Sequence, residues 1–294
     1  MPNTPAKQTA PSLRPLSFRA GILDWTTPYV MGVLNITPDS FSDGGKWSAG
    51  TSESLAAVVA EAEAMVQAGA DLLDIGGEST RPGAVPVTAE QECERVLPVI
   101  RALSDCLRVP LSIDTTKAAV ARRAVEAGAE LVNDVSGGRF DPEMTKTVDA
   151  LGAAFVCGHV RGNTLGDVHQ GKPASFDEVL SELQASLQEL PPGLRQRTIA
   201  DPCIGFGKDL QTNLALVQRA GEMANRLGCP ILVGPSRKRF LGEITGCPVG
   251  ERDGATVGAC LASVSGGAHM LRVHAVSMTS SALQVFCAAQ ELAA

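Results

Sequence analysis

Short apolar runs alternate with longer amphipathic runs along almost the whole chain. The amphipathic runs have helical spacing, as in Glu53–Ala68, Lys117–Ala127, Asn213–Leu227 and Ala255–Ser265. Predominantly apolar runs are typical of strands that are buried on both faces of a parallel sheet. Eight such strands are predicted, at Val30–Asn35, Asp71–Gly77, Leu111–Asp114, Leu131–Val135, Ala153–Gly158, Thr198–Ala200, Pro230–Gly234 and Met270–Val273.

Eight strand–helix units in about 250 residues match a (β/α)₈ barrel in both number and length. We therefore predict the α/β class and a TIM barrel, with a doubly wound sheet as the alternative. The barrel is expected to form one catalytic domain over residues 21–294. It follows a proline-rich tail over residues 1–20 that we expect to be disordered. Phe18–Trp25 is expected to form a hairpin that caps the barrel floor.

Polar side chains stand at the ends of the predicted strands. In a barrel the carboxyl ends of all strands meet at one face, and enzymes of this architecture carry their chemistry there. We therefore expect a shared polar cavity at this face. In chain order, the residues at the strand ends are Asn35, Glu78, Asp114, Asn133, His159, Asp201, Ser236 with Arg237 and Lys238, and Arg272 with His274.

The net charge of −7 at pH 7 argues against a nucleic-acid-binding protein, because such proteins display a basic surface. A site for an anion therefore needs positive charge that is gathered locally. Arg272 and His274 alternate on the last predicted strand, so both point to the same face, and this pair suits a phosphate group. No apolar run approaches the ~20 residues of a membrane-spanning helix, and we expect neither a membrane contact nor a secretory signal.

Eight cysteines are scattered along the chain without any CxxC pair. This spacing supports neither a zinc knuckle nor a thioredoxin-like motif, and most of the cysteines lie in apolar segments. We therefore expect buried free thiols and a reducing compartment, the cytoplasm.

Asp114 and Asp201 each follow an apolar strand, where an unpaired carboxylate would be costly. Each is either a structural group, in a salt bridge or a helix cap, or part of a binding site. Together with Asn133 they suit a flat heterocycle with several N–H groups, because a carboxylate accepts two parallel hydrogen bonds. For Glu78 and His159 a structural and a functional role remain equally open. Lys208 and Arg239 are either site residues or ordinary surface cations.

Two loops after the first two strands carry further candidate groups. The loop over residues 36–51 is rich in Asp, Ser and Gly, so it forms either a set of turns or a lid. Asn35, with Asp39 or Asp43, would supply oxygen ligands to Mg²⁺, which prefers few protein carboxylates together with substrate phosphates. In the second loop, over residues 79–90, Pro82 holds Arg81 in an extended conformation, which stiffens the loop.

Taken together, the motifs resemble those of the dihydropteroate synthase family from about Tyr29 to Val276, and their order and spacing make the match specific. The family joins 6-hydroxymethyl-7,8-dihydropterin pyrophosphate to p-aminobenzoate, releasing pyrophosphate and forming 7,8-dihydropteroate. The resemblance implies a TIM-barrel transferase of folate biosynthesis, a homodimer, and competition by sulfonamides. The motifs are NITPDSFSDGG (35–45), GGESTRPGA (76–84), Asp114, Asn133, DPCIGFGK (201–208), SRK (236–238) and RVH (272–274).

The resemblance also implies roles for individual residues. The pterin would be held by Asp114, Asn133, Asp201 and Lys238. The pyrophosphate would be bound by Asn35, Arg272 and His274, with Mg²⁺ at Asn35, and these three with Lys238 would be the catalytic groups. The p-aminobenzoate site would be shaped by Thr80, Arg81, Pro82, Phe206 and Ser236.

The chain departs from the family pattern at three places. Cys203 stands where glycine is usual, and it would be strained if the position needs a positive φ. Gly158-His159-Val160 replaces a Met-His-Met segment in one wall of the pterin pocket, and Ala275 replaces an aspartate. Two alternatives remain: a methyltetrahydrofolate-dependent corrinoid methyltransferase, which needs no pyrophosphate-binding residues, and a non-catalytic pterin-binding paralogue.

Overall fold

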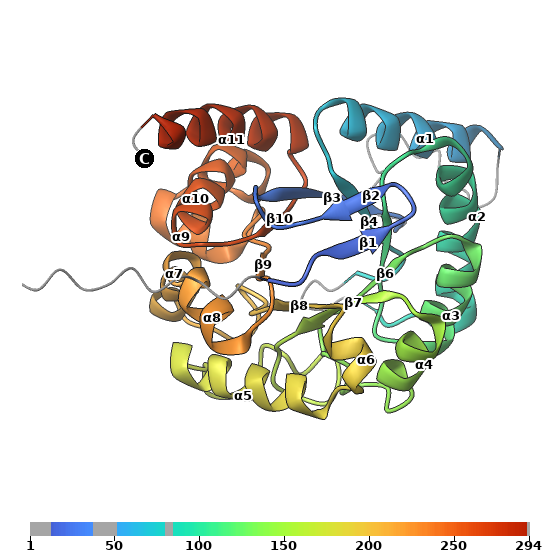
Figure 1. The fold of residues 1–294 in the computed structure, drawn as a ribbon, viewed down its shortest axis with the longest axis horizontal. Coiled ribbons are helices and arrows are strands. Elements are labelled where there is room, and N and C mark those ends of the chain that lie inside the picture. The colour runs from blue at the N-terminus through green and yellow to red at the C-terminus, as the bar shows by residue number, and fades with distance from the viewer. Residues whose placement is uncertain (1–12, 38–51, 80–84, 293–294) are drawn as a thin grey trace, which may run out of the picture.

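Eight parallel strands form the inner wall of the molecule, and helices surround them (Figure 1). The structure, a computed structural model, describes residues 13–37, 52–79 and 85–292. The sheet has the order β8-β7-β6-β5-β4-β3-β10-β9, and a parallel bridge between Ala200 and Ile231 joins its two edges into a barrel. The strands are β3 Tyr29–Asn35, β4 Leu72–Gly76, β5 Leu111–Asp114, β6 Leu131–Asp134, β7 Ala154–Gly158, β8 Thr198–Asp201, β9 Leu232–Val233 and β10 Met270–Val273. The predicted TIM barrel is confirmed.

The helices cover the outside of the sheet, and the main hydrophobic core lies between the two layers. In the described chain, none of the helices is both long and apolar enough to span a membrane. The helices are α1 Ser52–Gln67, α2 Ala89–Cys106, α3 Ala118–Ala127, α4 Met144–Leu151, α5 Phe176–Glu189, α6 Pro192–Arg195, α7 Leu210–Gln218, α8 Ala220–Leu227, α9 Arg239–Thr245, α10 Asp253–Ser265 and α11 Val276–Glu291, with a 3₁₀ turn η2 at Val249–Glu251.

One helix prediction is wrong. The expected helix Asn213–Leu227 is divided at Arg219 into α7 and α8. The Arg219 guanidinium bonds to Glu222 and lies 3.6 Å from the centre of the Phe176 ring, while the Gly221 N–H donates to the carbonyl of Gly266 at 2.6 Å. These contacts with neighbouring segments take the place of the intrahelical bond that a continuous helix would require.

A two-stranded hairpin, β1 Leu16–Phe18 and β2 Gly21–Leu23, closes the barrel floor as predicted. Leu16 and Leu23 are buried against the apolar side chains at the bottom of the barrel. The predicted tail over residues 1–20 is therefore too long, because burying Leu16 draws the chain into a strand despite the nearby prolines. Residues 1–12 lie outside the described residues.

Side chains in the lower half of the barrel interior are apolar, and those in the upper half are polar. The lower group packs against the hairpin and includes Leu72, Leu131, Ile199 and Met270. Because alternate residues of a strand point to the same side, two residues further along each strand the side chain again faces inward. Those next positions are Asp74, Asn133, Asp201 and Arg272.

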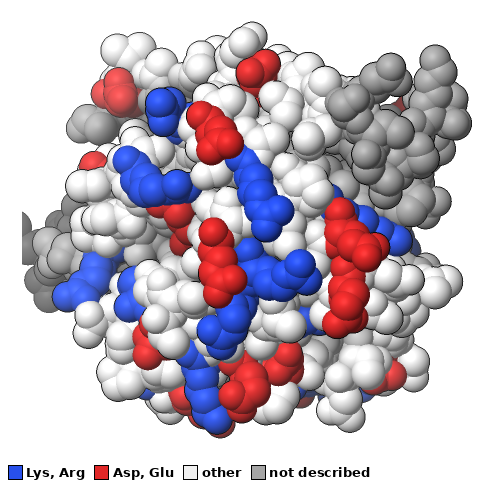
Figure 2. All heavy atoms as spheres, turned by 90° about the vertical axis from the view of Figure 1, so that its right-hand side faces the viewer, with Lys and Arg blue, Asp and Glu red and all other residues white. Residues whose placement is uncertain are grey.

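The outer surface is unevenly charged. Figure 2 shows Lys and Arg side chains interspersed with Asp and Glu on the face that lies on the right of Figure 1, where α2 and α3 run. By contrast, Arg272 is the only Lys, Arg, Asp or Glu between Asp253 and Glu291, a stretch that covers most of α10 and all of α11 except its last residue.

Candidate active site

A cavity of about 180 Å³ opens at the carboxyl ends of the strands. Six of the residues to which the resemblance assigns roles line it: Asn35, Asp114, Ser236, Lys238, Arg272 and His274. Glu78 and Arg237, two further residues at predicted strand ends, line it as well. Three other predicted residues lie beside this cavity. Asn133 bonds to Asp74, a partner of Arg272, while Asp201 and Phe206 are close to Lys238. Thr80, Arg81 and Pro82 lie outside the described residues, as do Asp39 and Asp43.

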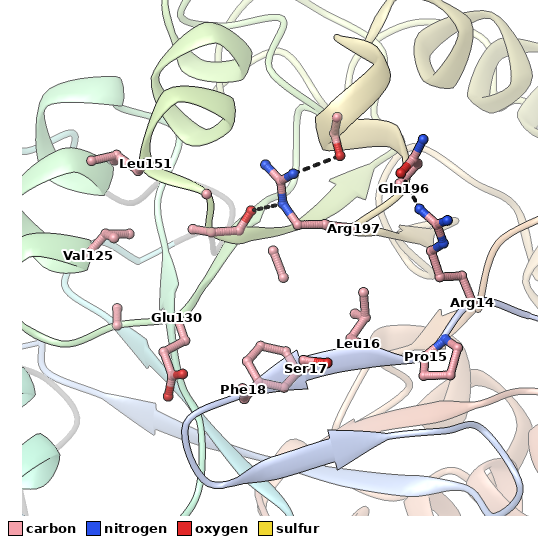
Figure 3. Close-up of a pocket in the computed structure, with 15 residues that line it drawn as sticks. Arg14, Pro15, Leu16, Ser17, Phe18, Val125, Glu130, Leu151, Gln196 and Arg197 are labelled. Carbon is pink, nitrogen blue, oxygen red and sulfur yellow. Dashed lines mark hydrogen bonds between the residues drawn. The ribbon is translucent and has the colours of Figure 1, made fainter.

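A larger cavity of about 430 Å³ lies at the opposite end of the barrel, between the hairpin and the loops that precede β6, β7 and β8 (Figure 3). Its charged groups already have protein partners. Arg197 donates to the carbonyls of Gly193 and Ala153, Arg14 bonds to Gln196, and Glu130 accepts from the Arg19 N–H. Because these charged groups are paired within the protein and the predicted site residues gather at the other end, we place the active site at the upper end.

Arg272 is held by two carboxylates in the middle of the site. Its Nε donates to Asp74 Oδ2 at 2.6 Å, and its Nη2 donates to Asp114 Oδ2 at 2.7 Å. Asn133 Nδ2 donates to the same Asp74 oxygen at 2.9 Å. Asp74 was not among the predicted site residues. Its position could have indicated a site residue: it is a carboxylate inside the apolar run Leu72–Gly76, and a buried carboxylate must be paired.

Strand register explains why the polar groups meet. Gly76 of β4 pairs with Asn35 of β3 on one side and with Asp114 of β5 on the other, and Asp114 pairs with Asn133 of β6. A Cβ on Gly76 would lie 3.6 Å from both Asn35 Oδ1 and Asp114 Cβ. Glycine at this position therefore leaves no side chain between the Asn35 amide and the Asp114 carboxylate.

Burial shifts the ionisation of several groups in the site. It raises the pKa of Asp114 to about 7, although the nearby Arg272 opposes that shift. Burial lowers the pKa of Lys238 to about 8, and the positive charge of Arg272 adds to the effect. For Arg272 burial acts to lower the pKa, but Asp74 and Asp114 outweigh it and the pKa is raised. The guanidinium therefore stays charged, while Asp114 and Lys238 titrate near neutral pH.

Ser236 and His274 bring the predicted p-aminobenzoate and pyrophosphate sites into contact. Ser236 Oγ lies 2.9 Å from His274 Nδ1, and the His274 backbone N–H donates to the same oxygen at 3.2 Å. Between Ser236 and Lys238, Arg237 has a φ of 58°, and its guanidinium is paired with Asp253. Arg237 therefore contributes little free charge to the cavity.

Asp201 ends β8, and the loop that follows it, before α7, carries Phe206. Asp201 Oδ1 accepts from the Cys203 N–H at 2.7 Å, and burial raises the pKa of this carboxyl. Cys203 has a φ of 50°, so the expected strain at this position is present. The ammonium of Lys238 lies 3.8 Å from the centre of the Phe206 ring, which also stacks with His169 at a centroid distance of 5.7 Å.

Lys208 is a buried anchor of that loop, and not a surface cation. Its Nζ donates to the carbonyls of His159 at 3.0 Å and Phe206 at 2.9 Å, and burial lowers its pKa to about 8. Burial lowers the pKa of His159 to about 4, and its Nε2 lies 2.9 Å from Glu182 Oε2. The structural role is the one that the geometry favours for His159.

Glu78 fixes the base of the second loop. Its Oε2 is 2.7 Å from Lys117 Nζ, its Oε1 accepts from the Val87 N–H at 3.0 Å, and Lys117 also bonds to the fully buried Glu92. In the described part of the chain, no group of three or more His, Cys, Asp and Glu residues is arranged to hold a metal ion. Asn35 therefore offers a single amide oxygen, which fits Mg²⁺ only if a substrate supplies further oxygen ligands.

Comparisons with known proteins agree with this geometry. A family model described as "Pterin binding enzyme" matches residues 31–274. A dihydropteroate synthase of Synechocystis sp. is 42% identical over 281 residues, which cover 92% of this chain and 93% of that protein. The solved structure of Xanthomonas albilineans dihydropteroate synthase with 4-aminobenzoic acid is 39% identical, with a TM-score of 0.83 and coverage of 96% and 99% of the two chains.

A second solved structure, Yersinia pestis dihydropteroate synthase with a sulfonamide drug complex, is 34% identical to this chain. Its TM-score is 0.85, and the match covers 94% of this chain and 99% of that one. Family model, sequence relative and solved structures all span nearly the whole barrel. The chain belongs to the dihydropteroate synthase family of pterin binding enzymes.

Proposed function

We propose that this protein is a dihydropteroate synthase, a transferase of folate biosynthesis. It joins 6-hydroxymethyl-7,8-dihydropterin pyrophosphate to p-aminobenzoate and releases pyrophosphate. The observation that carries the proposal is the position of Arg272, a charged guanidinium bonded to two carboxylates and lining the same cavity as His274 and Lys238. A pterin ring with N–H groups and an anionic leaving group need this combination of acceptors and cations.

The carboxylates and the amide recognise the pterin. Asp114 and Asn133 are paired on the neighbouring strands β5 and β6, and Asp201 lies two strands further along the sheet, on β8. In their ionised form the two carboxylates accept paired N–H groups from an aminopyrimidinone edge, and rigid strands hold them in place. Lys238 supplies a positive charge beside them, and the Phe206 ring stabilises that charge.

Catalysis stabilises the negative charge that develops on the leaving pyrophosphate. Arg272 and His274 supply positively charged or hydrogen-bonding groups at this end of the cavity. We propose that Asn35 contributes one oxygen ligand to a Mg²⁺ ion, which would neutralise the pyrophosphate oxygens that complete its coordination. The electron-rich dihydropterin delocalises positive charge as the C–O bond breaks, so the bond breaks before the amine attacks.

The p-aminobenzoate site adjoins the leaving-group site through Ser236 and His274. An arylamine is neutral at neutral pH, so it attacks without a strong general base. We propose that Phe206 and Ser236 form one side of this site and that Thr80, Arg81 and Pro82 complete it. The X. albilineans and Y. pestis relatives were solved with 4-aminobenzoic acid and with a sulfonamide drug complex. We therefore propose that sulfonamides compete with p-aminobenzoate here.

The test is pyrophosphate release from the dihydropterin pyrophosphate, with p-aminobenzoate and Mg²⁺ each present or omitted. We expect rapid release only with both, and 7,8-dihydropteroate as the product. Pterin binding without release would overturn the proposal in favour of a non-catalytic pterin-binding protein. Binding of methyltetrahydrofolate and methyl transfer to a corrinoid would instead identify the methyltransferase alternative.

We also propose a cytoplasmic homodimer that pairs through α10 and α11. Apart from Asp253 and Glu291 at their ends, these helices carry no Lys, Arg, Asp or Glu. A Cβ on Gly254 or Gly258 would meet nothing within 4 Å, and Met278 and Val285 are 50% and 72% exposed. A face that combines small and large apolar residues without charges is typical of subunit interfaces. All eight cysteines are free thiols, which supports a reducing compartment.

A further inference from the structure

Asp74 is the fully buried carboxylate that joins the two functional halves of the site. Its Oδ2 accepts from Arg272 Nε at 2.6 Å and from Asn133 Nδ2 at 2.9 Å. We propose that Asp74 is a positioning residue: it fixes the position of the anion-binding Arg272 relative to the pterin-binding Asn133. The proposal rests on the proposed function, since the roles of Arg272 and Asn133 come from it.

The link through Asp74 spans strands that do not touch. Asn133 lies on β6, Asp74 on β4 and Arg272 on β10, with β5 and β3 between them in the sheet. Backbone hydrogen bonds connect neighbouring strands only, so the relative position of these side chains depends on contacts across the barrel interior. A single oxygen makes both contacts, and any shift of Asp74 therefore moves the two groups together.

The guanidinium is oriented by two carboxylates at two different nitrogens. Asp74 takes Nε and Asp114 takes Nη2, so the plane of the group is fixed, and among the described residues Nη1 has no hydrogen-bond partner. Arginine binds oxyanions through its fixed fork of donors, so its orientation decides which oxygen it reaches. Without Asp74, Arg272 would pair with Asp114 alone, the carboxylate that is proposed to receive the pterin.

The second oxygen of Asp74 supports a role beyond packing. Oδ1 is buried and has no hydrogen-bond partner. A carboxylate kept only for stability would be expected to use both oxygens, since an unsatisfied buried polar atom is unfavourable. Asp134 provides the contrast: it is equally buried, and both of its oxygens bond to the adjacent turn, to Ser136 and Gly138.

The test compares Asp74→Asn with the matched control Asp134→Asn. Both replace a fully buried carboxylate by an amide of the same size, but only the first touches Arg272 and Asn133. We measure kcat, the KM of p-aminobenzoate, and by calorimetry the Kd of 6-hydroxymethylpterin and of Mg²⁺-pyrophosphate. Thermal unfolding of each variant gives the loss of stability.

For Asp74→Asn we expect kcat to fall by roughly tenfold to a hundredfold, the effect of misplaced catalytic groups. Both Kd values should rise, while the KM of p-aminobenzoate should change by less than about threefold. Asp134→Asn should lower the melting temperature without a selective change in either Kd. If Asp74→Asn does not fold, Asp74→Ser, in which water has room to enter, is measured in the same way.

Unchanged Kd values and kcat in Asp74→Asn would overturn the proposal. So would losses of the same size in both variants, because they would reflect stability alone. The binding measurements separate this outcome from a failure of the proposed function. If the unaltered protein binds both ligands but releases no pyrophosphate, the synthase assignment fails, while the calorimetric comparison still decides the role of Asp74. If it binds neither ligand, both fail.

Discussion

Cys203 combines two opposing effects in one residue. Its φ of 50° is unfavourable for any side chain with a Cβ, while its thiol is buried and contacts the carbonyl of Val135. The backbone N–H of this strained residue donates to the Asp201 carboxylate. The conformation of the loop that carries Phe206 therefore depends on Cys203.

We expect Cys203→Gly to be more stable than Cys203→Ala, by about 1 kcal/mol. Both variants lose the buried thiol, but only glycine releases the strain of the positive φ. Urea unfolding of the two proteins measures the difference. If position 203 had an ordinary negative φ, the Cys203→Ala variant would be the more stable of the two. A more stable Cys203→Ala would therefore contradict the strain described here.

Asp114 makes stability depend on pH. Burial raises its pKa from 3.8 to about 7, so the folded protein holds this proton more tightly than the unfolded chain. Its contribution to stability is fully present below the unfolded pKa and is lost as the pH rises through the folded pKa.

We therefore expect the free energy of unfolding to fall by a larger amount between pH 4 and pH 7 in the unaltered protein than in Asp114→Asn. Asp134 has a raised pKa of about 6 and titrates in the same range, but it is present in both proteins and cancels in the comparison. Denaturant titrations at a series of pH values measure the difference. Parallel curves for the two proteins would show that Asp114 does not titrate as described.

At the scale of elements, two glycines lie in contrasting surroundings: Gly258 on an exposed helix face, and Gly267 where two segments pack closely. A Cβ on Gly258 of α10 would meet no atom within 4 Å. Gly267, between α10 and β10, has a φ of 91°, and a Cβ there would lie 2.7 Å from the Cα of Gly221 at the start of α8. The same substitution should therefore have opposite effects at the two sites.

We expect Gly258→Ala to stabilise the folded subunit by about 0.5–1 kcal/mol, because alanine has the higher helix propensity. Gly267→Ala should destabilise it by about 1–3 kcal/mol or more, through a strained φ and a clash with backbone. Thermal unfolding of both variants, at a concentration where the subunit is monomeric, measures this. Equal effects would contradict the described crossing of α8 with the segment before β10.

For the whole molecule, the uncharged face of α10 and α11 determines the expected association. Lys, Arg, Asp and Glu side chains are scattered over the face shown in Figure 2, whereas Arg272 is the only such residue between Asp253 and Glu291. Val285 is 72% exposed on this face.

We expect Val285→Arg to convert a dimer into a monomer, because it would bury an unpaired charge in the interface. Sedimentation velocity at micromolar concentration measures the change, and circular dichroism checks that the fold is kept. Ile22→Arg on β2, an exposed apolar position in the hairpin at the barrel floor, is the control and should leave the dimer intact. A monomeric unaltered protein would contradict the proposed interface.

Much of the architecture could be predicted from the sequence because it depends on local pattern. Leu111–Asp114 and Met270–Val273 form strands with the predicted bounds, since apolar runs of this length are buried on both faces wherever a parallel sheet forms. The break between α7 and α8 could not be predicted, because it depends on Gly266 and Phe176, which are distant in sequence. The start of β1 at Leu16, within the expected tail, likewise depends on residues distant in sequence, those at the bottom of the barrel.

The sequence by itself determined the barrel, the family and eight of the residues that line the cavity, because strand ends and motifs are local features. Only the tertiary structure decided which groups bond to one another. Asp74 sits in the middle of an apolar strand, and only closure of the barrel brings it to Arg272, 198 positions later. Lys208 resembles a surface cation until the loop folds over it and its ammonium meets two carbonyls. Burial and long-range pairing set charge and orientation, and both are properties of the assembled barrel.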